Sequence, residues 1–388
     1  MTKLNSSFHF VAVLYVFMVA RFCYADTSRS PGSRQQVEEV TRHLNKHPVK
    51  SIKSPDGDII DCVHISHQPA FDHPLLKNHT IKMKPNYYPN WINKMSSEAS
   101  SSLTQLWHSK GKCPKGTIPI IRTKKEDVLN SVKIYRKKNL PKQQHASAYT
   151  NGQLYGTQAS LNIWNPKIQK SNEYSSAQIW IVGGSFDADL NTIEAGWHVY
   201  PELYGDNNTR LFIHWTSDGY RKTGCYNLKC SGFIQTDNRI AIGGGFIPVM
   251  TQFGGVQYEF TLTIWKDQQS GDWWLQWGSE LVIGYWPSSL FSYLSENAWM
   301  IQWGGEVVNF GSHGQHTTTQ MGSGHFPRQG FGKASYIRHI EILDESGNSR
   351  TPKDLNTIAD QNSCYDISTN IDDDFLYYGG PGRNKNCP

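Results

Sequence analysis

From about residue 150 onward, the sequence alternates apolar and polar residues with a period of two. Tyr258–Ile264 follow this alternation without a break, which is typical of a strand with one buried face. Similar β-branched or aromatic runs occupy 178–182, 211–215, 273–277 and 336–342. Glycine-rich turns separate the runs, and no helical pattern of about twelve residues intervenes. Many short strands at short spacing predict an all-β fold, either a sandwich or a barrel.

The N-terminus has the three parts of a secretory signal peptide. Lys3 supplies a positive charge, Phe8–Ala20 are a short apolar stretch, and Cys23 and Ala25 are small residues before a cleavage point. We expect residues 1–25 to be removed and the mature protein to be secreted, with the apoplast or the vacuole as destinations. No stretch reaches the roughly 18 apolar residues of a membrane span, so no membrane partner is expected. The alternative for this stretch is a short buried helix.

Charge divides the rest of the chain into two parts. Residues 26–145 hold 21 Lys and Arg against 10 Asp and Glu, whereas residues 146–388 hold 15 against 23. Export argues against nucleic acid as the partner of the basic part, so we expect it to dock on the acidic part of its own chain. Such docking weakens as carboxylates protonate, which predicts release at acid pH. The alternative is two solvated surfaces with unrelated charge.

Residues 26–145 are expected to form a small α+β pro-region with a cleavable end. An apolar repeat at helical spacing, closed by a proline, comprises Val37, Val40, Thr41, Leu44 and Pro48. A turn at 54–57 precedes the apolar pair Ile59–Ile60. Basic clusters at 122–125 and 136–138 precede a polar stretch that ends at His145, and we expect a protease-sensitive linker near 120–145. Residues 146–388 are then the second domain.

Six cysteines remain after removal of the signal peptide, and an even number suggests disulfides in an exported chain. Six cysteines allow 15 pairings in principle. The spacing favours the local pairs Cys225–Cys230 and Cys364–Cys387, which leaves Cys62–Cys113. No zinc-ligand spacing occurs around them. Glycosylation sequons begin at Asn78 and Asn207.

Two carboxylates stand out by their neighbours. Glu194 lies among apolar and small residues at 190–197, and Glu306 follows Gly304–Gly305 within an apolar run. Glycine beside a carboxylate leaves room for a substrate backbone. The sequence contains no metal motif, phosphate loop or nucleophile elbow, so neither a metal nor a cofactor is expected. The alternative for each glutamate is a solvated strand residue.

Several long strings make this sequence resemble the neprosin family. They lie at 193–206, 223–233, 303–307 and 377–384, and the pro-region is similar to the family's activation domain at 58–63 and 68–74. The likeness covers nearly the whole chain after the signal peptide. It implies an antiparallel β-sandwich of two sheets, made as a zymogen that its own pro-domain inhibits. It also implies a glutamic peptidase without metal or cofactor, active at acid pH on peptide or protein substrates, with cleavage after proline.

The family's two catalytic glutamates fall on Glu194 and Glu306. Amide hydrolysis without a metal or a covalent nucleophile needs an activated water and a proton donor. Two neighbouring carboxyls can share one proton, so that the ionised one acts on water and the protonated one donates. Such a pair titrates as a unit, and the sequence does not assign the base to either residue. An aromatic cleft is also expected, from the tryptophans nearest the motifs: Trp197, Trp215, Trp299 and Trp303. The alternative for each of these tryptophans is packing in the core.

Two other functions stay open at this point. A non-catalytic secreted module could present its tryptophan-rich face to cell-wall carbohydrate, and it would not need both glutamates. A glycoside hydrolase, in contrast, also uses paired carboxylates. Cleavage of a peptide at acid pH separates the peptidase from both.

Overall fold

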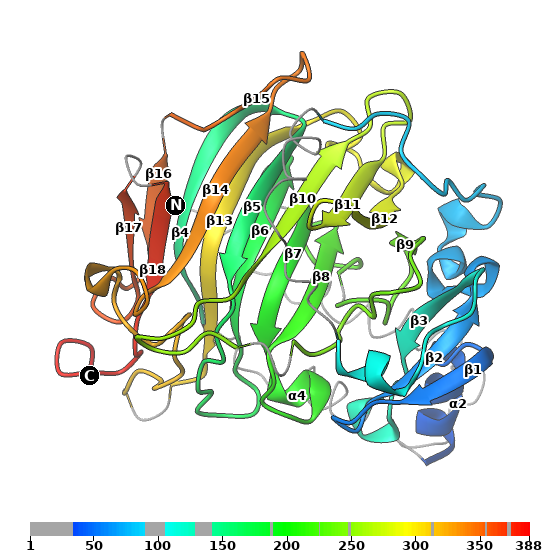
Figure 1. Cartoon of the computed structure of the whole chain (residues 1–388), viewed down its shortest axis with the longest axis horizontal. Coiled ribbons are helices and arrows are strands. Elements are labelled where there is room, and N and C mark those ends of the chain that lie inside the picture. Colours follow the sequence, from blue (N-terminus) through cyan, green and yellow to red (C-terminus); the bar gives the residue numbers. More distant parts are fainter. Residues whose placement is uncertain are drawn as a thin grey trace, which may run out of the picture.

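The computed structural model describes residues 34–89, 105–128, 142–186, 189–224, 226–246, 250–311, 314–353, 355–370 and 374–388. The predicted signal peptide lies outside these residues, as do residues 129–141 of the predicted linker. The strands form three sheets of three, nine and six strands, and the pairs within them are antiparallel. Two sheets stack face to face in Figure 1, and the three-stranded sheet lies at one side of them. The predicted all-β sandwich is confirmed.

The six-stranded sheet carries both glutamates. Its strands are β4 (Lys142–Leu154), β6 (Ser175–Gly183), β7 (Asn191–Val199), β8 (Arg210–Thr216), β13 (Ala298–Asn309) and β16 (Asn356–Ala359). Their order across the sheet is β16-β4-β13-β6-β7-β8. Alternate residues such as Ile179, Ala195 and Trp303 are fully buried in the core between the sheets. The residues between them point to the outer face, because successive side chains in a strand point to opposite sides.

The nine-stranded sheet supplies the other half of the core. Its strands are β5 (Gly156–Asn162), β9 (Ile234–Gln235), β10 (Glu259–Lys266), β11 (Trp273–Trp277), β12 (Leu281–Trp286), β14 (Ser335–Leu343), β15 (Ser349–Arg350), β17 (Asp366–Asn370) and β18 (Phe375–Gly379). The order is β17-β18-β14-β5-β10-β11-β12-β9, with β15 paired to β14. The side chains of Trp265, Trp273 and Trp286 are fully buried here. Each of the five predicted strand runs coincides with a strand of one of these two sheets.

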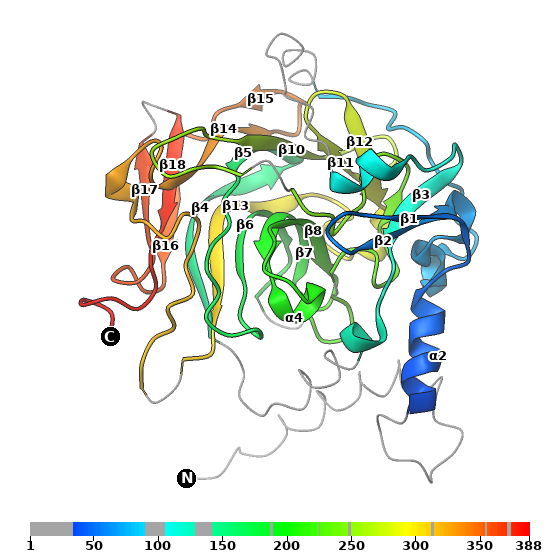
Figure 2. The ribbon, with the colours of Figure 1, turned by 60° about the horizontal axis from the view of Figure 1, so that its bottom comes forward.

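The described part of the pro-region combines helices with a small sheet, as expected for an α+β unit. α2 spans Arg34–Leu44, and β1 (Pro48–Lys53), β2 (Ile59–His64) and β3 (Thr117–Ile121) pair in that order. Figure 2 shows α2 projecting away from the sandwich. Other helices within the described residues are short: Ile65–His67, Pro69–Asp72, Pro74–Leu76, Leu106–Lys110, α4 (Pro201–Tyr204), Ser288–Leu290 and Pro327–Gln329.

The disulfides agree with the expected pairing where both partners are described. Cys62 is bonded to Cys113, and Cys364 is bonded to Cys387. Cys230 is also disulfide-bonded, and its expected partner Cys225 lies outside the described residues.

The six-stranded sheet begins earlier than the sequence indicates. Lys142–His145, which were assigned to the linker, form the start of β4 and pair with Glu306–Asn309 of β13. These four residues are polar, and a strand held by backbone hydrogen bonds to a neighbour does not need apolar side chains. The polar composition therefore concealed the strand.

Candidate active site

Glu194 and Glu306 lie on one face of the six-stranded sheet, on the two strands that flank β6 (Figure 1). Glu194 of β7 is the register partner of Trp180, and Glu306 of β13 is the register partner of Ser176. Both partners lie on the outer face of β6, because residues four apart on a strand share a face. Gln178 occupies the position midway between them. The two carboxyls therefore stand diagonally across β6 on the outer face.

Four side chains converge on the Glu194 carboxyl. Thr192 Oγ1 donates to Oε1 at 2.9 Å, and Gln178 Nε2 donates to Oε2 at 3.0 Å. The Tyr220 hydroxyl also donates to Oε1. His214 Nδ1 lies 3.4 Å from the same oxygen. A carboxyl that accepts this many donors is held as a carboxylate.

Glu306 has fewer partners. The Tyr174 hydroxyl donates to its Oε1 at 2.6 Å. His145 of β4 is its direct register partner on the side away from β6. The ring of His145 is held in turn by Asp360, whose Oδ2 lies 2.9 Å from Nδ1.

The two environments shift the pKa values of the two glutamates in opposite directions. Burial opposes the ionisation of Glu194, but His214, Tyr220 and Thr192 together outweigh it and lower the pKa of Glu194 below its ordinary value. Burial raises the pKa of Glu306, and repulsion from Glu194 raises it further. His145, Tyr174 and, least of the three, His214 offset only part of this rise. The expected distribution is an ionised Glu194 beside a protonated Glu306, which is the state that acid–base hydrolysis by two carboxyls requires.

From the sequence only the two glutamates were expected, not their partners. Gln178 and His214 lie inside runs predicted as strands. They occupy the alternate positions, whose side chains point away from the core. The same period of two, followed onto the outer face, identifies them as neighbours of the site. Tyr220 lies in the loop after β8, and no pattern in the sequence indicates it.

The tryptophans expected to line a cleft occupy different places. Trp197, Trp215 and Trp303 are buried in the core, so the expectation is wrong for these three. Trp299 is half-buried and packs edge-on against Phe186 with ring centroids 5.8 Å apart. Alternation explains the error, because a tryptophan next to an outer-face glycine or histidine in a strand must point inward.

The glycines beside the glutamates serve the packing of the sheet. A β-carbon at Gly304 would lie 2.4 Å from the Ala146 carbonyl oxygen, and one at Gly196 would lie 2.0 Å from that of Ala177. These distances are shorter than any van der Waals contact. The expected role, room for a substrate backbone, is therefore wrong for both positions, where a neighbouring strand takes up the space.

The pro-region contacts the sandwich through groups of both charges. Lys82 Nζ pairs with Asp272 Oδ2 at 2.5 Å, which is the expected polarity. Asp58 Oδ2 pairs with Arg210 Nη1 at 2.5 Å, with the opposite polarity and with both side chains buried. The net charges of the two parts of the chain therefore do not predict the polarity of each ion pair at this interface. Among the hydrogen bonds of the described residues, those to the carboxyl oxygens of Glu194 and Glu306 come from the sandwich and not from the pro-region.

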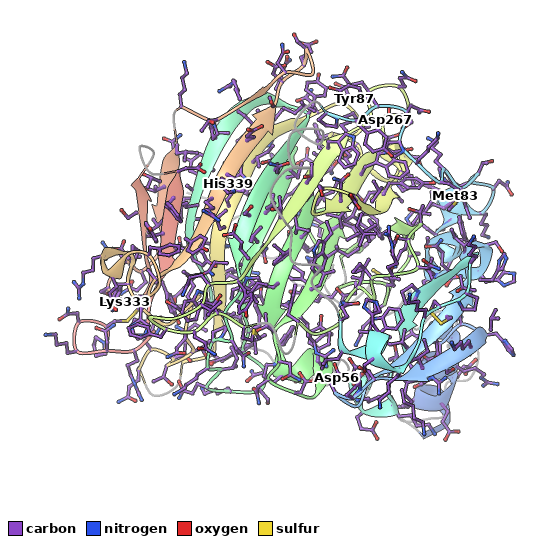
Figure 3. The ribbon with its side chains drawn as sticks, viewed as in Figure 1. Asp56, Met83, Tyr87, Asp267, Lys333 and His339 are labelled. Atoms are coloured by element: carbon purple, nitrogen blue, oxygen red, sulfur yellow. A yellow bond between two sulfur atoms is a disulfide. The ribbon has the colours of Figure 1, made fainter. Side chains whose placement is uncertain are left out.

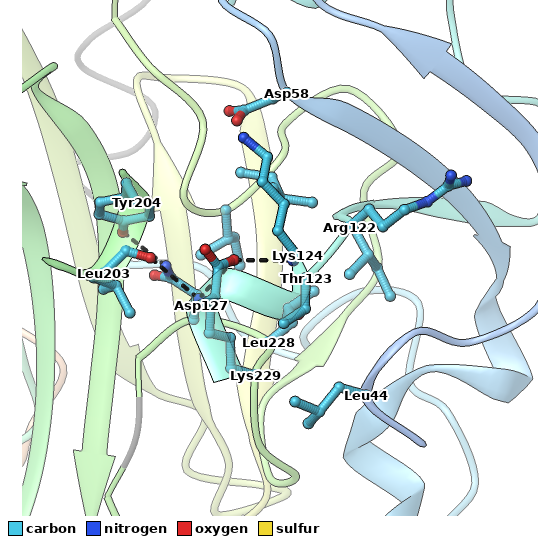
Figure 4. A pocket seen from close by; sticks show the side chains of 14 residues that line it. Leu44, Asp58, Arg122, Thr123, Lys124, Asp127, Leu203, Tyr204, Leu228 and Lys229 are labelled. Atoms are coloured by element: carbon cyan, nitrogen blue, oxygen red, sulfur yellow. Dashed lines mark hydrogen bonds and ion pairs between the residues drawn. The ribbon is translucent and has the colours of Figure 1, made fainter. Parts of the chain in front are cut away.

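Further contacts lie at both ends of the interface. Near one end the Asn86 backbone N–H donates to Asp267 Oδ2 at 2.6 Å, and Figure 3 labels Asp267 beside Tyr87. At the other end a small pocket lies between the pro-region and α4, and Figure 4 shows its lining. Lys229 and Asp127 face each other across it at 3.7 Å.

Two further expectations concern the surface. Asn78 and Asn207, the first residues of the two sequons, are both exposed. Glycosylation at either position stays a prediction. Within the described ranges, no helix is both long enough and apolar enough to cross a membrane.

Comparison with known proteins gives two family matches and several similar structures. The family model described as Neprosin matches residues 171–381, and the one described as Neprosin activation peptide matches residues 51–184. Scytalido-glutamic peptidase, solved with a peptide-based transition state analog, is 12% identical over 62% of this chain and 100% of its own, with a TM-score of 0.36. SCP-B, a member of the Eqolisin family of peptidases solved with the tripeptide Ala-Ile-His, is 11% identical over 62% of this chain and 100% of its own, with a TM-score of 0.34.

The Neprosin match spans more than half of the 388 residues and contains both glutamates. The activation-peptide match covers the three-stranded sheet and the start of the sandwich. The chain therefore belongs to the Neprosin family, and it is a glutamic peptidase that is made as a zymogen with an activation peptide.

Proposed function

We propose that this chain is the secreted zymogen of an acid-active endopeptidase that cleaves after proline, with Glu194 and Glu306 as its catalytic pair. One observation carries the proposal. Two buried carboxyls project from the same face of one sheet, on either side of β6, and their pKa values are shifted apart. Carboxyls with separated pKa values are suited to act as one base and one acid.

The shifts assign a role to each glutamate. The Glu194 carboxylate takes a proton from a water molecule while the water oxygen attacks the carbonyl carbon of the substrate. The protonated Glu306 gives its proton to the departing amide nitrogen as the carbon–nitrogen bond breaks. Activity is then highest between the lowered pKa of Glu194 and the raised pKa of Glu306. Below this window both groups are protonated, and above it both are ionised.

Access to the pair changes on maturation under this proposal. In the full-length chain Glu194 and Glu306 are only 5% and 4% exposed, so a substrate cannot reach both carboxyls. We expect processing of the zymogen to open the outer face of the six-stranded sheet. The exposed sequon residues and the disulfides support export, because disulfides persist in oxidising compartments.

Preference for proline is supported by aromatic side chains on the outer face. Trp180 stands opposite Glu194 in register. Tyr149 and Trp299 belong to the same outer cluster. A proline ring is a compact apolar group that packs well on such flat side chains.

The test uses the exported full-length chain at acid pH. Self-processing and cleavage of a proline-containing peptide are followed in the wild type and in the Glu194→Gln and Glu306→Gln variants. We expect each substitution to abolish both activities. Glu280→Gln, which removes an exposed carboxyl outside the site, should leave them unchanged. Full activity in either site variant contradicts the proposal, and carbohydrate binding without peptide cleavage favours the binding module instead.

A further inference from the structure

We propose that His214 is a positioning residue that keeps Glu194 ionised at acid pH and thereby sets the lower pH limit of activity. This inference rests on the proposed function, since it assigns a role beside one member of the catalytic pair. His214 itself does not touch the substrate in this proposal. It acts through Glu194.

The strand register brings the two side chains together. His214 of β8 is the direct register partner of Glu194 of β7, and its Nδ1 lies 3.4 Å from Glu194 Oε1. The two side chains are only 13% and 7% exposed. A charge interaction at this distance is weakly screened when water is largely excluded. Imidazoles carry a proton at acid pH, so the pair becomes ionic under the conditions in which the enzyme is proposed to work.

Two tyrosines fix the orientation of the imidazole. The ring of Tyr220 stacks on one side of His214 with centroids 5.3 Å apart and planes 9° apart. The ring of Tyr226 stacks on it at 4.5 Å and 17°. The stack therefore holds the His214 ring in position beside Glu194.

The loop after β8 is built to bring Tyr220 into this stack. Tyr220 has a φ of 59°, in the left-handed region that a bulky residue rarely adopts. Asp218 holds the loop by accepting the backbone N–H groups of Lys222 and Thr223 at 2.8 and 3.1 Å. The strained conformation is retained where the Tyr220 hydroxyl reaches Glu194.

Other groups that face Glu194 cannot replace the charge of His214. Thr192 and Gln178 are neutral donors. Glu306 opposes the ionisation of Glu194, since two like charges repel. His145 is a cation at acid pH, but it stands opposite Glu306 on the far side of β13 and β6. Without His214, the effect of burial, which raises the pKa of Glu194, therefore outweighs the effect of the remaining neutral donors.

The test compares the pH dependence of peptide cleavage in His214→Phe and His214→Gln with that of the wild type. Phenylalanine keeps an aromatic ring between the two tyrosines without the charge, and glutamine keeps a neutral donor. We expect the acid limb of kcat/KM to move to higher pH by about one unit in both variants, because an opposite charge this close shifts a carboxyl by about one unit or more. Below the limb the rate should fall about tenfold. The alkaline limb should move less than the acid limb, because His214 acts more weakly on Glu306 than on Glu194.

A second histidine provides the control. His339 Nε2 lies 3.6 Å from Asp374 Oδ2 on the nine-stranded sheet, so His339→Asn removes a similar pair away from the site. Its profile should match that of the wild type. Thermal unfolding of each variant shows whether it is folded, so that a loss of rate through misfolding is not mistaken for a displaced acid limb. One folded His214 variant is enough for the test.

The outcomes distinguish this inference from the proposed function. A uniform loss of rate with an unmoved acid limb in a folded His214 variant overturns the positioning role alone, provided that Glu194→Gln abolishes cleavage. Cleavage that survives in Glu194→Gln overturns the proposed function, and the inference falls with it. An acid limb that moves in the His214 variants and not in His339→Asn supports the positioning role of His214.

Discussion

His145 on β4 stands directly opposite Glu306 on β13. Its ring is anchored from the other side, because Asp360 Oδ2 lies 2.9 Å from Nδ1 and also accepts the His145 backbone N–H at 2.8 Å. Burial lowers the pKa of His145, but the negative charges of Asp360 and Glu306 outweigh burial and raise it. Each glutamate thus has a histidine on the neighbouring strand that lies away from β6. Each histidine also interacts with the other glutamate, but the nearer pair should dominate, so the two histidines should act mainly on opposite ends of the pH profile.

Removing the charge of His145 should extend activity to higher pH. His145 lowers the pKa of Glu306, so His145→Phe lets that pKa rise and keeps Glu306 protonated further into the neutral range. We expect the alkaline limb of kcat/KM to move up by about one unit, and the acid limb to move less, because His145 interacts more weakly with Glu194 than with Glu306. Asp360→Asn should act in the same direction and less strongly. An acid limb that moves further than the alkaline limb, or no displacement at all, contradicts this assignment of Glu306 as the acid.

Three histidines of the pro-region are partly buried against the sandwich. His73 packs on Trp215 with ring centroids 6.2 Å apart. A ring nitrogen of His79 lies 2.8 Å from the Tyr285 hydroxyl. A ring nitrogen of His108 is 2.6 Å from a backbone carbonyl oxygen, that of Arg239, and therefore donates to it.

Acid should weaken docking through these histidines. Burial lowers the pKa of each one below its ordinary value of 6.5. A group whose pKa is depressed in the docked state favours docking above its ordinary value, and this contribution is lost as the pH falls below about 6.5. The variant His73→Gln/His79→Gln/His108→Gln should therefore require a lower pH to begin self-processing. Substitution of the exposed His43 and His67 should leave the onset where it is, and an unchanged onset in the triple variant contradicts the prediction.

The sandwich could be predicted because many of its strands show the apolar or alternating residue runs that are typical of β-structure. The Tyr258–Ile264 alternation overlaps β10, where Phe260 and Leu262 are buried and Glu259 and Thr261 are partly exposed. The start of β4 was missed because Lys142–His145 are held by backbone pairing with β13, which leaves no mark on composition. A strand that is specified by its side chains can be recognised in a sequence, whereas a strand that is held by backbone hydrogen bonds alone cannot.

The site could be predicted only in part, for a related reason. The two glutamates were found through long strings shared with a family, but their arrangement across β6 depends on strand order and register. The reversed polarity of the Asp58–Arg210 pair illustrates the same limit, since net charge says nothing about which groups meet. The stack on His214 depends on one strained loop residue, Tyr220, and a single backbone conformation is not readable from residue types.

The Cys62–Cys113 disulfide should stabilise the pro-region more than the peptidase domain. It closes a separation of 51 residues, for which loop entropy gives about 4 kcal/mol. The cluster around it is small, comprising Ile52, Ile60, Trp107 and Ala241 besides the two cysteines. We expect Cys62→Ser/Cys113→Ser to unfold the pro-region at lower temperature and to self-process faster at neutral pH. Calorimetry that shows one unchanged transition contradicts this.

The Asp58–Arg210 pair should not be the acid trigger, although it is the buried ion pair of the interface. Burial raises the pKa of Asp58 above its ordinary value, and Arg210 offsets only part of this rise. A carboxyl with a raised pKa in the docked state favours docking most at low pH, and its contribution falls as the pH rises. Arg210 also keeps a second partner, because Asp206 Oδ2 lies 2.5 Å from its Nη2. Self-processing of Asp58→Asn should therefore begin at the same pH as in the wild type, whereas the triple histidine variant should differ. Rapid processing of Asp58→Asn at neutral pH would instead identify the protonation of Asp58 as the step that releases the pro-region.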